Sequence, residues 1–193
     1  MTKEVLKFSL RQILSKWPLH LTAIPPLRMA AVLVIIHYTR TSPRIILTKR
    51  NSTLKTHKGE IAFPGGEFSK QDKSLYDTAT RETREEIGLI IEHKDILGRL
   101  QSVRTLTSNF CIIPFVTLQD KILEPQILIN EVQEVIDAPL FDLLDTLQID
   151  LEHQSLSTKS LHKFTYQSEV IWGATARIIK QLHDCLYVKR DFY

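Results

Sequence analysis

The chain has 193 residues, of which 43% are apolar and 24% are charged, and its formal net charge is +3. This balance excludes a disordered chain, and the length fits a single domain over residues 1–193 with its own hydrophobic core. Two cysteines are too few for a disulfide framework or a cysteine-rich zinc module, so a reducing, cytoplasmic location is expected. The small charge excess gives no argument for nucleic acid as a partner. Without an apolar run of about 18 residues, no membrane partner is expected either.

Apolar residues follow helical spacing in some segments and form strand-like runs in others. A first helix is expected over residues 3–16, and this helix and the loop up to residue 27 should pack on the domain. Its basic side chains leave import into an organelle open as an alternative. Strands are expected at 28–38, 44–49, 60–63, 96–105, 111–118, 132–137 and 161–166. Helices are expected from Ser74 to Gly88, over 139–144 and over 174–187. Strands before, between and after helices indicate the mixed α/β class.

The helix expected between Ser74 and Gly88 carries three carboxylates on one narrow stripe. At about 100° per residue, Glu85 lies about 60° to one side of Glu82, and Glu86 lies about 40° to the other side. Like charges repel, and near a helix C-terminus they also meet the unfavourable end of the helix dipole. A hard divalent cation, Mg²⁺ or Mn²⁺, would relieve this cost because both accept oxygen ligands. Taken alone, the spacing favours a solvated acidic face.

Neighbouring residues shift the balance toward a metal site. A second stripe can pack inward, which leaves the carboxylates facing outward, and it consists of Tyr76, Ala79, Thr83 and Ile87. Arg81 lies one turn before Glu85 and is expected to pair with it. The preceding loop carries Gly65 and Gly66, and glycines allow a backbone to approach a phosphate or metal closely. A Gly-Gly pair followed by a capped, Glu-rich helix therefore favours metal binding over a solvated surface.

The segment from Gly66 to Leu89 resembles the Nudix box, G-x5-E-x7-R-E-U-x-E-E-x-G-U, in which U is a bulky apolar residue. The matching positions are Gly66, Arg81, Glu82, Glu85, Glu86, Gly88 and Leu89. Thr83 stands at a bulky position, and the loop is one residue longer than the pattern, so that Lys73 stands where the pattern has its first acid. Asp72 is expected to replace that acid in a salt bridge.

This resemblance implies the Nudix fold, a mixed β-sheet between helices with the box as loop-helix-loop. It also implies that Glu82, Glu85, Glu86 and the backbone carbonyl of Gly66 hold the metal, and that Arg81 belongs with the catalytic residues.

A second resemblance is narrower. The run Leu47-Thr48-Lys49-Arg50, followed by Lys55, Gly59 and Phe63-Pro64-Gly65-Gly66, is similar to the signature of the coenzyme A pyrophosphatase branch, LLTxR(S/A)xxxRxxxGxxxFPGG. Ile46 replaces its first Leu, Asn51 its small residue and Lys55 its second Arg, which keeps the charge but loses bidentate geometry. Later blocks are also similar, so the resemblance covers residues 28–185. It implies hydrolysis of coenzyme A or an acyl derivative to 3′,5′-ADP and 4′-phosphopantetheine.

Two further sets of side chains are candidates for the site. Basic residues in and beside the loop 51–59 are candidates to hold distal phosphates, although any one of them is more often a solvated surface charge than a ligand; they are Arg50, Lys55, His57 and Lys58. Glu131 and Glu134, at the start of the strand 132–137, are candidates for a further acid, with ordinary loop acids as an equal alternative. Cys111 is expected in the core.

The sequence therefore predicts a Mg²⁺- or Mn²⁺-dependent hydrolase that cleaves the pyrophosphate of coenzyme A or an acyl derivative. One alternative is a hydrolase of another nucleoside diphosphate derivative, such as ADP-ribose or a dinucleotide. The other is a Nudix-fold binding module without catalysis, against which the intact Glu82, Glu85 and Glu86 argue. The partner is expected to be a small-molecule substrate. The oligomeric state stays open, with a homodimer as one option.

Overall fold

The computed structural model describes residues 1–14, 27–39, 42–53, 58–120, 124–157 and 160–187. Its helices are α1 (Lys3–Leu14), α2 (Leu75–Ile87), α3 (Leu140–Leu144) and α4 (Gly173–Tyr187), and its 3₁₀ turns are η1 (His93–Asp95) and η2 (Gln154–Leu156). Its strands are β1 (Arg28–Thr39), β2 (Ser42–Arg50), β3 (Ile61–Ala62), β4 (Gly65–Glu67), β5 (Ile96–Arg99), β6 (Val103–Arg104), β7 (Phe110–Gln119), β8 (Val132–Pro139), β9 (Gln148–Ile149), β10 (His162–Tyr166) and β11 (Glu169–Ile171).

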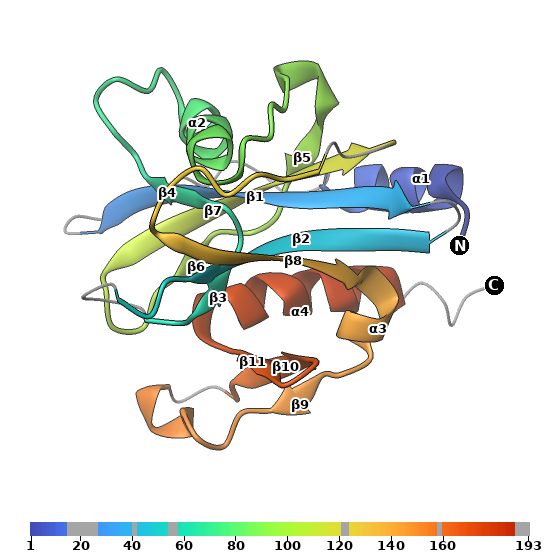
Figure 1. Cartoon of the computed structure of the whole chain (residues 1–193). Helices are drawn as coiled ribbons and strands as arrows, with labels where there is room; N and C mark the ends of the chain where they lie inside the picture. The colour runs from blue at the N-terminus through green and yellow to red at the C-terminus, as the bar shows by residue number, and fades with distance from the viewer. Residues whose placement is uncertain (15–26, 40–41, 54–57, 121–123, 158–159, 188–193) are drawn as a thin grey trace.

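A twisted eight-stranded sheet lies between α2 on one face and α4 on the other, and a three-stranded sheet of β9, β10 and β11 lies beyond α4 (Figure 1). The large sheet has the order β3-β2-β1-β7-β5, with β4 beside β1, β6 beside β7 and β8 beside β2. β1 and β7 run parallel, and the other pairs are antiparallel. A mixed sheet between helices confirms the expected fold class.

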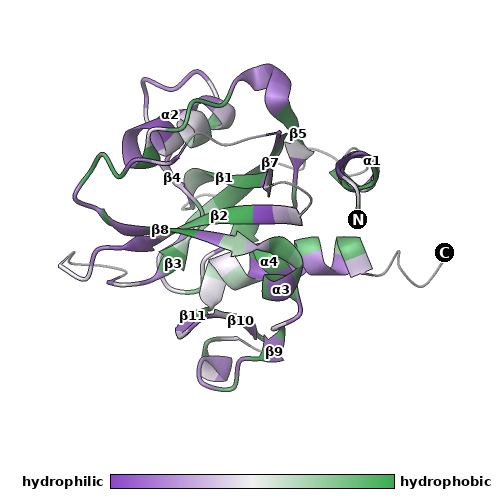
Figure 2. Cartoon of the chain, turned by 45° about the vertical axis from the view of Figure 1, so that its right-hand side comes forward, coloured by the Kyte–Doolittle hydropathy of each residue, from purple (hydrophilic) through white to green (hydrophobic). Residues whose placement is uncertain are grey.

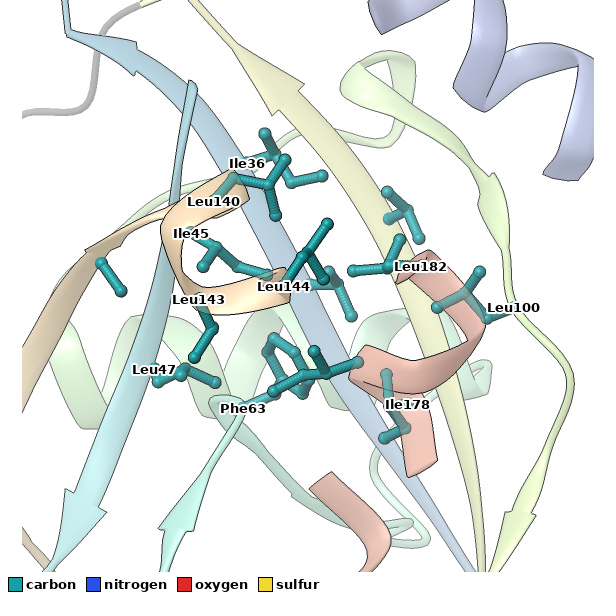
Figure 3. Close-up of a cluster of buried hydrophobic side chains, with 14 of the residues drawn as sticks. Ile36, Ile45, Leu47, Phe63, Leu100, Leu140, Leu143, Leu144, Ile178 and Leu182 are labelled. Carbon is teal, nitrogen blue, oxygen red and sulfur yellow. The ribbon is translucent and has the colours of Figure 1, made fainter. Parts of the chain in front are cut away.

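Side chains of the sheet alternate between its two faces and build two apolar clusters of unequal size. The larger cluster joins Ile36 and Ile45 to the helices α3 and α4 (Figure 3). The smaller cluster joins Leu33 and Ile46 to Ile87 of α2. In Figure 2 the central strands β1 and β2 are coloured mainly as hydrophobic, whereas many of the loops around the sheet are hydrophilic. Helix α2 is therefore held on the sheet face opposite the main core.

The first expected helix is present and packs on this core. In the described part of the chain α1 ends at Leu14, and its side chains Leu6, Leu10 and Leu14 are buried in the larger cluster. Residues 15–26, which include the end of the expected helix and most of the loop after it, lie outside the described residues.

The strand expected over 96–105 is wrong as a single element, because it is broken into β5 and β6. Both pieces pair with β7, but Pro114 of β7 lies between the two paired stretches: Arg99 is opposite Phe115, and Val103 is opposite Ile112. Proline has no backbone N–H to donate to a ladder, so pairing is interrupted there. Cys111 is buried in β7, as expected.

The closing helix begins one residue earlier than expected, at Gly173. Ile178, Leu182 and Leu186 are buried against the core, and Cys185 is only half-buried. No helix in the described part of the chain is long and apolar enough to span a membrane.

Candidate active site

Local capping determines where α2 begins and ends, as the sequence predicts. The N-cap is Ser74: its Oγ accepts from the backbone N–H of Asp77 at 3.2 Å and donates to the Asp77 carboxylate at 2.9 Å. At the other end Gly88 has a φ of +70°, and its N–H donates to the Arg84 carbonyl at 3.0 Å. The three glutamates therefore lie on a helix with two defined ends.

Replacing Ser74 with alanine should lower the free energy of unfolding by about 1 kcal/mol, because the Asp77 N–H loses its acceptor. Activity per folded molecule should change little, since Ser74 is at the end of α2 remote from the glutamates. Chemical denaturation of the variant beside Ser102→Ala, an exposed loop serine, measures this difference. Equal unfolding free energies would remove the capping role of Ser74.

The Gly65-Gly66 pair brings the loop against both β1 and α2. A Cβ atom on Gly65, whose φ is +150°, would lie 2.3 Å from the Ala31 carbonyl oxygen of β1. A Cβ atom on Gly66 would lie 2.6 Å from Cδ of Glu82. Gly65 is therefore required by its close approach to the backbone of β1, whereas the group that approaches Gly66 is the end of the Glu82 side chain from α2.

The three carboxylates do not share one environment. Glu85 is exposed, Glu82 is partly buried, and Glu86 is buried with 5% exposure. The expectation that the whole stripe faces outward is therefore wrong for Glu86. It lies on the side of the helix next to the buried residues Ala79 and Thr83, and the Gly65 N–H donates to its Oε2 at 3.2 Å. The space that a side chain at Gly66 would fill is occupied by the Glu82 carboxylate, whereas Glu86 is held by the backbone N–H of Gly65.

Burial changes the acid strength of two of these groups. Desolvation raises the pKa of Glu86 to about 8, against the opposing hydrogen bond from Gly65. Burial also raises the pKa of Glu82, and the neighbouring Arg81 guanidinium opposes that rise. Carboxylates held in this way are costly in the charged form unless a positive charge joins them.

Arg81 links the helix to the preceding loop through Asp72. Its Nε and Nη2 donate to the two Asp72 oxygens at 2.7 and 2.9 Å, which confirms the expected salt bridge. Asp72 is buried and also accepts from the Ser69 N–H at 3.0 Å and the Thr78 hydroxyl at 2.9 Å. The same guanidinium donates through Nη1 to Glu85 at 3.0 Å, as expected, and to Glu82 at 2.8 Å.

The two candidate acids at the start of β8, Glu131 just before the strand and Glu134 within it, lie on opposite faces of the sheet. Lys49 of β2 is opposite Glu134, but Arg50 is opposite Val132, so one extra residue bulges from β8 between them. Lys49 binds Glu169 of β11 at 2.6 Å, on the face away from α2, and Glu134 shares that face.

On the other side of the bulge, the side chain of Val132 belongs to the smaller apolar cluster beneath α2. The preceding residue, Glu131, accepts from Nη2 of Arg50 at 3.3 Å. Charges on Arg50 and Glu131 both act on Glu86, where Arg50 lowers its pKa and Glu131 raises it. Of the two candidate acids, only Glu131 is therefore brought to the carboxylates of α2.

Of the four basic candidates, the described part of the structure places only Arg50 next to the carboxylates. Arg50 lies beside Glu131, and its Nε is buried with no hydrogen-bond partner among the described residues. Lys58 is exposed, while Lys55 and His57 fall outside the described residues. Two residues were missed by the sequence analysis: Thr78, which binds Asp72, and Asn51, whose side chain reaches Asn130. The 79-residue separation of Asn51 from Asn130 left no local signal for that contact.

The oxygen ligands at this site suit a hard divalent cation. In the conformation of the described residues, no three His, Cys, Asp or Glu side chains converge closely enough to hold a metal ion. Arg81 holds Glu82 and Glu85, and Gly65 binds Glu86. A buried carboxylate supported by one backbone N–H nonetheless suits a cation, which would offset its desolvation.

Comparison with solved structures agrees with this architecture. The NUDIX domain of NrtR from Shewanella oneidensis, in a complex with ADP ribose, superposes with a TM-score of 0.60 over 96% of this chain and 99% of that chain, at 18% identity. A NUDIX hydrolase from Alicyclobacillus acidocaldarius gives a TM-score of 0.51 over 64% of this chain and 83% of that chain, at 21% identity. Both likenesses show the fold.

Sequence comparison identifies the family. The NUDIX domain model matches residues 27–158. The Nudix hydrolase NudL of Pectobacterium atrosepticum is 34% identical over 185 residues, which cover 91% of this chain and 93% of that protein. NudL of Cronobacter sakazakii is 35% identical over 158 residues, which cover 80% of this chain and 81% of that protein. With the glycine loop and the glutamate helix in place, the chain belongs to the Nudix family and is a Nudix hydrolase.

Proposed function

We propose that the chain hydrolyses the pyrophosphate bond of coenzyme A or an acyl derivative, releasing 3′,5′-ADP and 4′-phosphopantetheine or its acyl form. The observation that carries this proposal is the position of Arg50. Arg50 belongs to the segment similar to the coenzyme A pyrophosphatase branch, and it lies beside Glu131 and acts on Glu86. Residues that resemble a substrate signature and residues of the Nudix box thus meet at one place.

The metal-holding groups in this proposal are Glu82, Glu85, Glu86 and the backbone carbonyl of Gly66, with Mg²⁺ or Mn²⁺ as the cofactor. Such a cation neutralises charge on the pyrophosphate oxygens and favours deprotonation of the attacking water. To hold the cation, Glu82 and Glu85 would give up their hydrogen bonds from Nη1 of Arg81, while Nε and Nη2 of Arg81 would remain bound to Asp72. Asp72 thus keeps the guanidinium in place when the other contacts are exchanged.

Glu131 is the further acid in this proposal. Its carboxylate is half exposed beside Arg50, and its charge already acts on Glu86. A carboxylate in that place accepts a proton from water at Oε1 or Oε2 as the water attacks phosphorus. Glu134, on the other face of the sheet, has no such role.

Arg50 supports binding of the pyrophosphate itself. Its buried Nε has no acceptor among the described residues, and a phosphate oxygen would supply one. The basic loop after it, with Lys55, His57 and Lys58, then meets the more distant 3′-phosphate of coenzyme A. Replacing Arg50 and replacing the loop lysines are therefore expected to have different effects on the cleavage of coenzyme A and of an analogue without the 3′-phosphate.

Dephospho-coenzyme A should be cleaved with a kcat/KM about 10- to 100-fold lower than that of coenzyme A, because one charge-assisted phosphate contact is worth about 1.5–3 kcal/mol. Lys55→Ala and Lys58→Ala should reduce the difference in kcat/KM between the two substrates. Arg50→Ala should lower kcat/KM on both substrates alike, since the pyrophosphate is common to them. Equal kcat/KM for the two substrates in the unmodified enzyme would contradict a role of this loop in reading the 3′-phosphate.

The experiment that tests the function as a whole is a substrate panel with Mg²⁺ and with Mn²⁺, in which mass spectrometry identifies the products. Coenzyme A, an acyl-coenzyme A, ADP-ribose and a dinucleoside polyphosphate are sufficient. We expect 3′,5′-ADP from the first two. Rapid cleavage of ADP-ribose with none of coenzyme A would overturn the substrate assignment and leave the glutamate helix in place as the hydrolytic site.

A further inference from the structure

The side chain of Asn51 joins two segments that lie far apart in the sequence. Its Nδ2 donates to the Asn130 carbonyl at 3.0 Å, and its Oδ1 accepts from the backbone N–H of Thr53 at 3.1 Å and the Thr53 hydroxyl at 3.0 Å. A carbonyl only accepts and a backbone N–H only donates, so these partners define the orientation of the amide. One half of the carboxamide therefore holds the basic loop, and the other half holds the turn before β8.

That turn is also fixed to the glutamate helix. The N–H of Gln126 donates to the Ile87 carbonyl and the N–H of Leu128 donates to the Glu86 carbonyl, each at 3.0 Å. These bonds satisfy two of the carbonyls that the end of a helix leaves open. The segment 126–131 thus runs from the last turn of α2 to Asn51.

Glu131 lies at the end of this segment that Asn51 holds. Its carbonyl accepts from the Asn51 N–H at 2.7 Å, and its side chain contacts Arg50. The next residue, Val132, begins the strand at the bulge. Because the Glu131 carboxylate is half exposed, few packing contacts define its position. Besides Arg50, the hydrogen bonds of Asn51 to the Asn130 and Glu131 carbonyls hold the backbone that carries this side chain.

We propose that Asn51 is a positioning residue that sets the Glu131 carboxylate against Arg50 and the glutamates of α2. This inference rests on the proposed role of Glu131 as the further acid. Asn51 reaches Asn130 through its amide nitrogen, and no shorter side chain spans that gap. Serine at this position still offers an oxygen to the Thr53 N–H, but it lacks the group that binds Asn130.

The test compares two neutral variants that each remove one of the hydrogen bonds of the Asn51 side chain. Asn51→Ser loses the bond to Asn130 and keeps an acceptor for the Thr53 N–H. Thr53→Val loses the hydroxyl contact and keeps the bond to Asn130. Misplacing a catalytic group by about 1 Å costs up to 100-fold, and the Asn51 backbone bond to Glu131 remains, so Asn51→Ser should lower kcat about 10-fold. KM should stay within about twofold, and Thr53→Val should retain nearly all of the activity.

The decisive measurement is the double variant with Glu131→Gln, assayed with Mg²⁺ on coenzyme A or, if the panel shows another substrate, on that substrate. Glu131→Gln alone should lower kcat about 100-fold, and Asn51→Ser should add almost nothing in that background. Thermal unfolding of each variant reports stability separately.

Two outcomes would overturn the proposal: equal losses of kcat from Asn51→Ser with and without Glu131, or a kcat within twofold of the unmodified enzyme in Asn51→Ser. Full activity in Glu131→Gln would overturn both the further acid and its positioning. In that case, hydrolysis of coenzyme A by the unmodified enzyme would show that the proposed function itself still holds.

Discussion

Replacing Glu86 with glutamine should lower turnover by about 100-fold or more, because both a ligand and a negative charge are lost where the cation must be held. The variant should fold normally. Glutamine has nearly the same shape, its oxygen still accepts the Gly65 N–H, and it removes a carboxylate whose pKa burial raises to about 8. The melting temperature of the metal-free protein should therefore be unchanged or higher, while kcat at saturating Mg²⁺ or Mn²⁺ falls.

Glu82→Gln should have a loss of similar size, since Glu82 lies against Gly66 at the centre of the same site. Glu134→Gln is the matched control, because the same chemical change is made on the sheet face away from α2. Full activity in both Glu82→Gln and Glu86→Gln would remove the glutamate helix as the metal site.

Replacing Asp72 with alanine should lower the free energy of unfolding by about 3–5 kcal/mol, because the Arg81 guanidinium is left partly buried without its bidentate partner. The Ser69 N–H and the Thr78 hydroxyl lose an acceptor in the same step. Asp142→Asn, which changes an exposed carboxylate, should cost less than about 0.5 kcal/mol. Urea denaturation of the three proteins at neutral pH measures the differences.

The pH dependence gives this prediction a second measurement. Hydrogen bonds from Arg81 hold the pKa of Asp72 well below its usual range, against the opposing effect of burial. The resulting stability is fully present above the unfolded-state pKa of about 3.9 and is lost as the pH falls toward the folded-state value. The difference in unfolding free energy between the unmodified protein and Asp72→Ala should be constant above about pH 5 and shrink below about pH 4. A difference that grows at low pH would contradict the pairing.

Features of the site that depend on neighbours along the chain were predictable. Ser74 and Gly88 define α2 through bonds within a few residues, and Arg81 pairs with Glu85 across one turn. Asp72 was predictable from the resemblance, because it stands one residue before the position where the box pattern has its first acid, and the structure shows its salt bridge with Arg81.

Features that depend on a second strand were not predictable. The inward turn of Glu86 requires the glycine loop, which meets α2 only after β4 pairs with β1. The choice of Glu131 over Glu134 depends on one extra residue in β8 opposite Arg50, and a sequence pattern does not show a bulge. The break between β5 and β6 likewise arises from Pro114 of a different strand.

The unequal apolar clusters on the two faces of the sheet have a consequence for motion. On the α2 face, the helix itself contributes only Ala79 and Ile87 to the buried apolar cluster, whereas α4 contributes larger side chains to the main core. Segments with few buried apolar contacts open locally at a lower free energy than the rest of a protein. Amide hydrogens of α2 should therefore exchange with solvent through openings that leave α4 protected. Any ligand that bridges the glutamates to the loops around them should slow exchange in α2 first, so that exchange in this helix would report occupancy of the site.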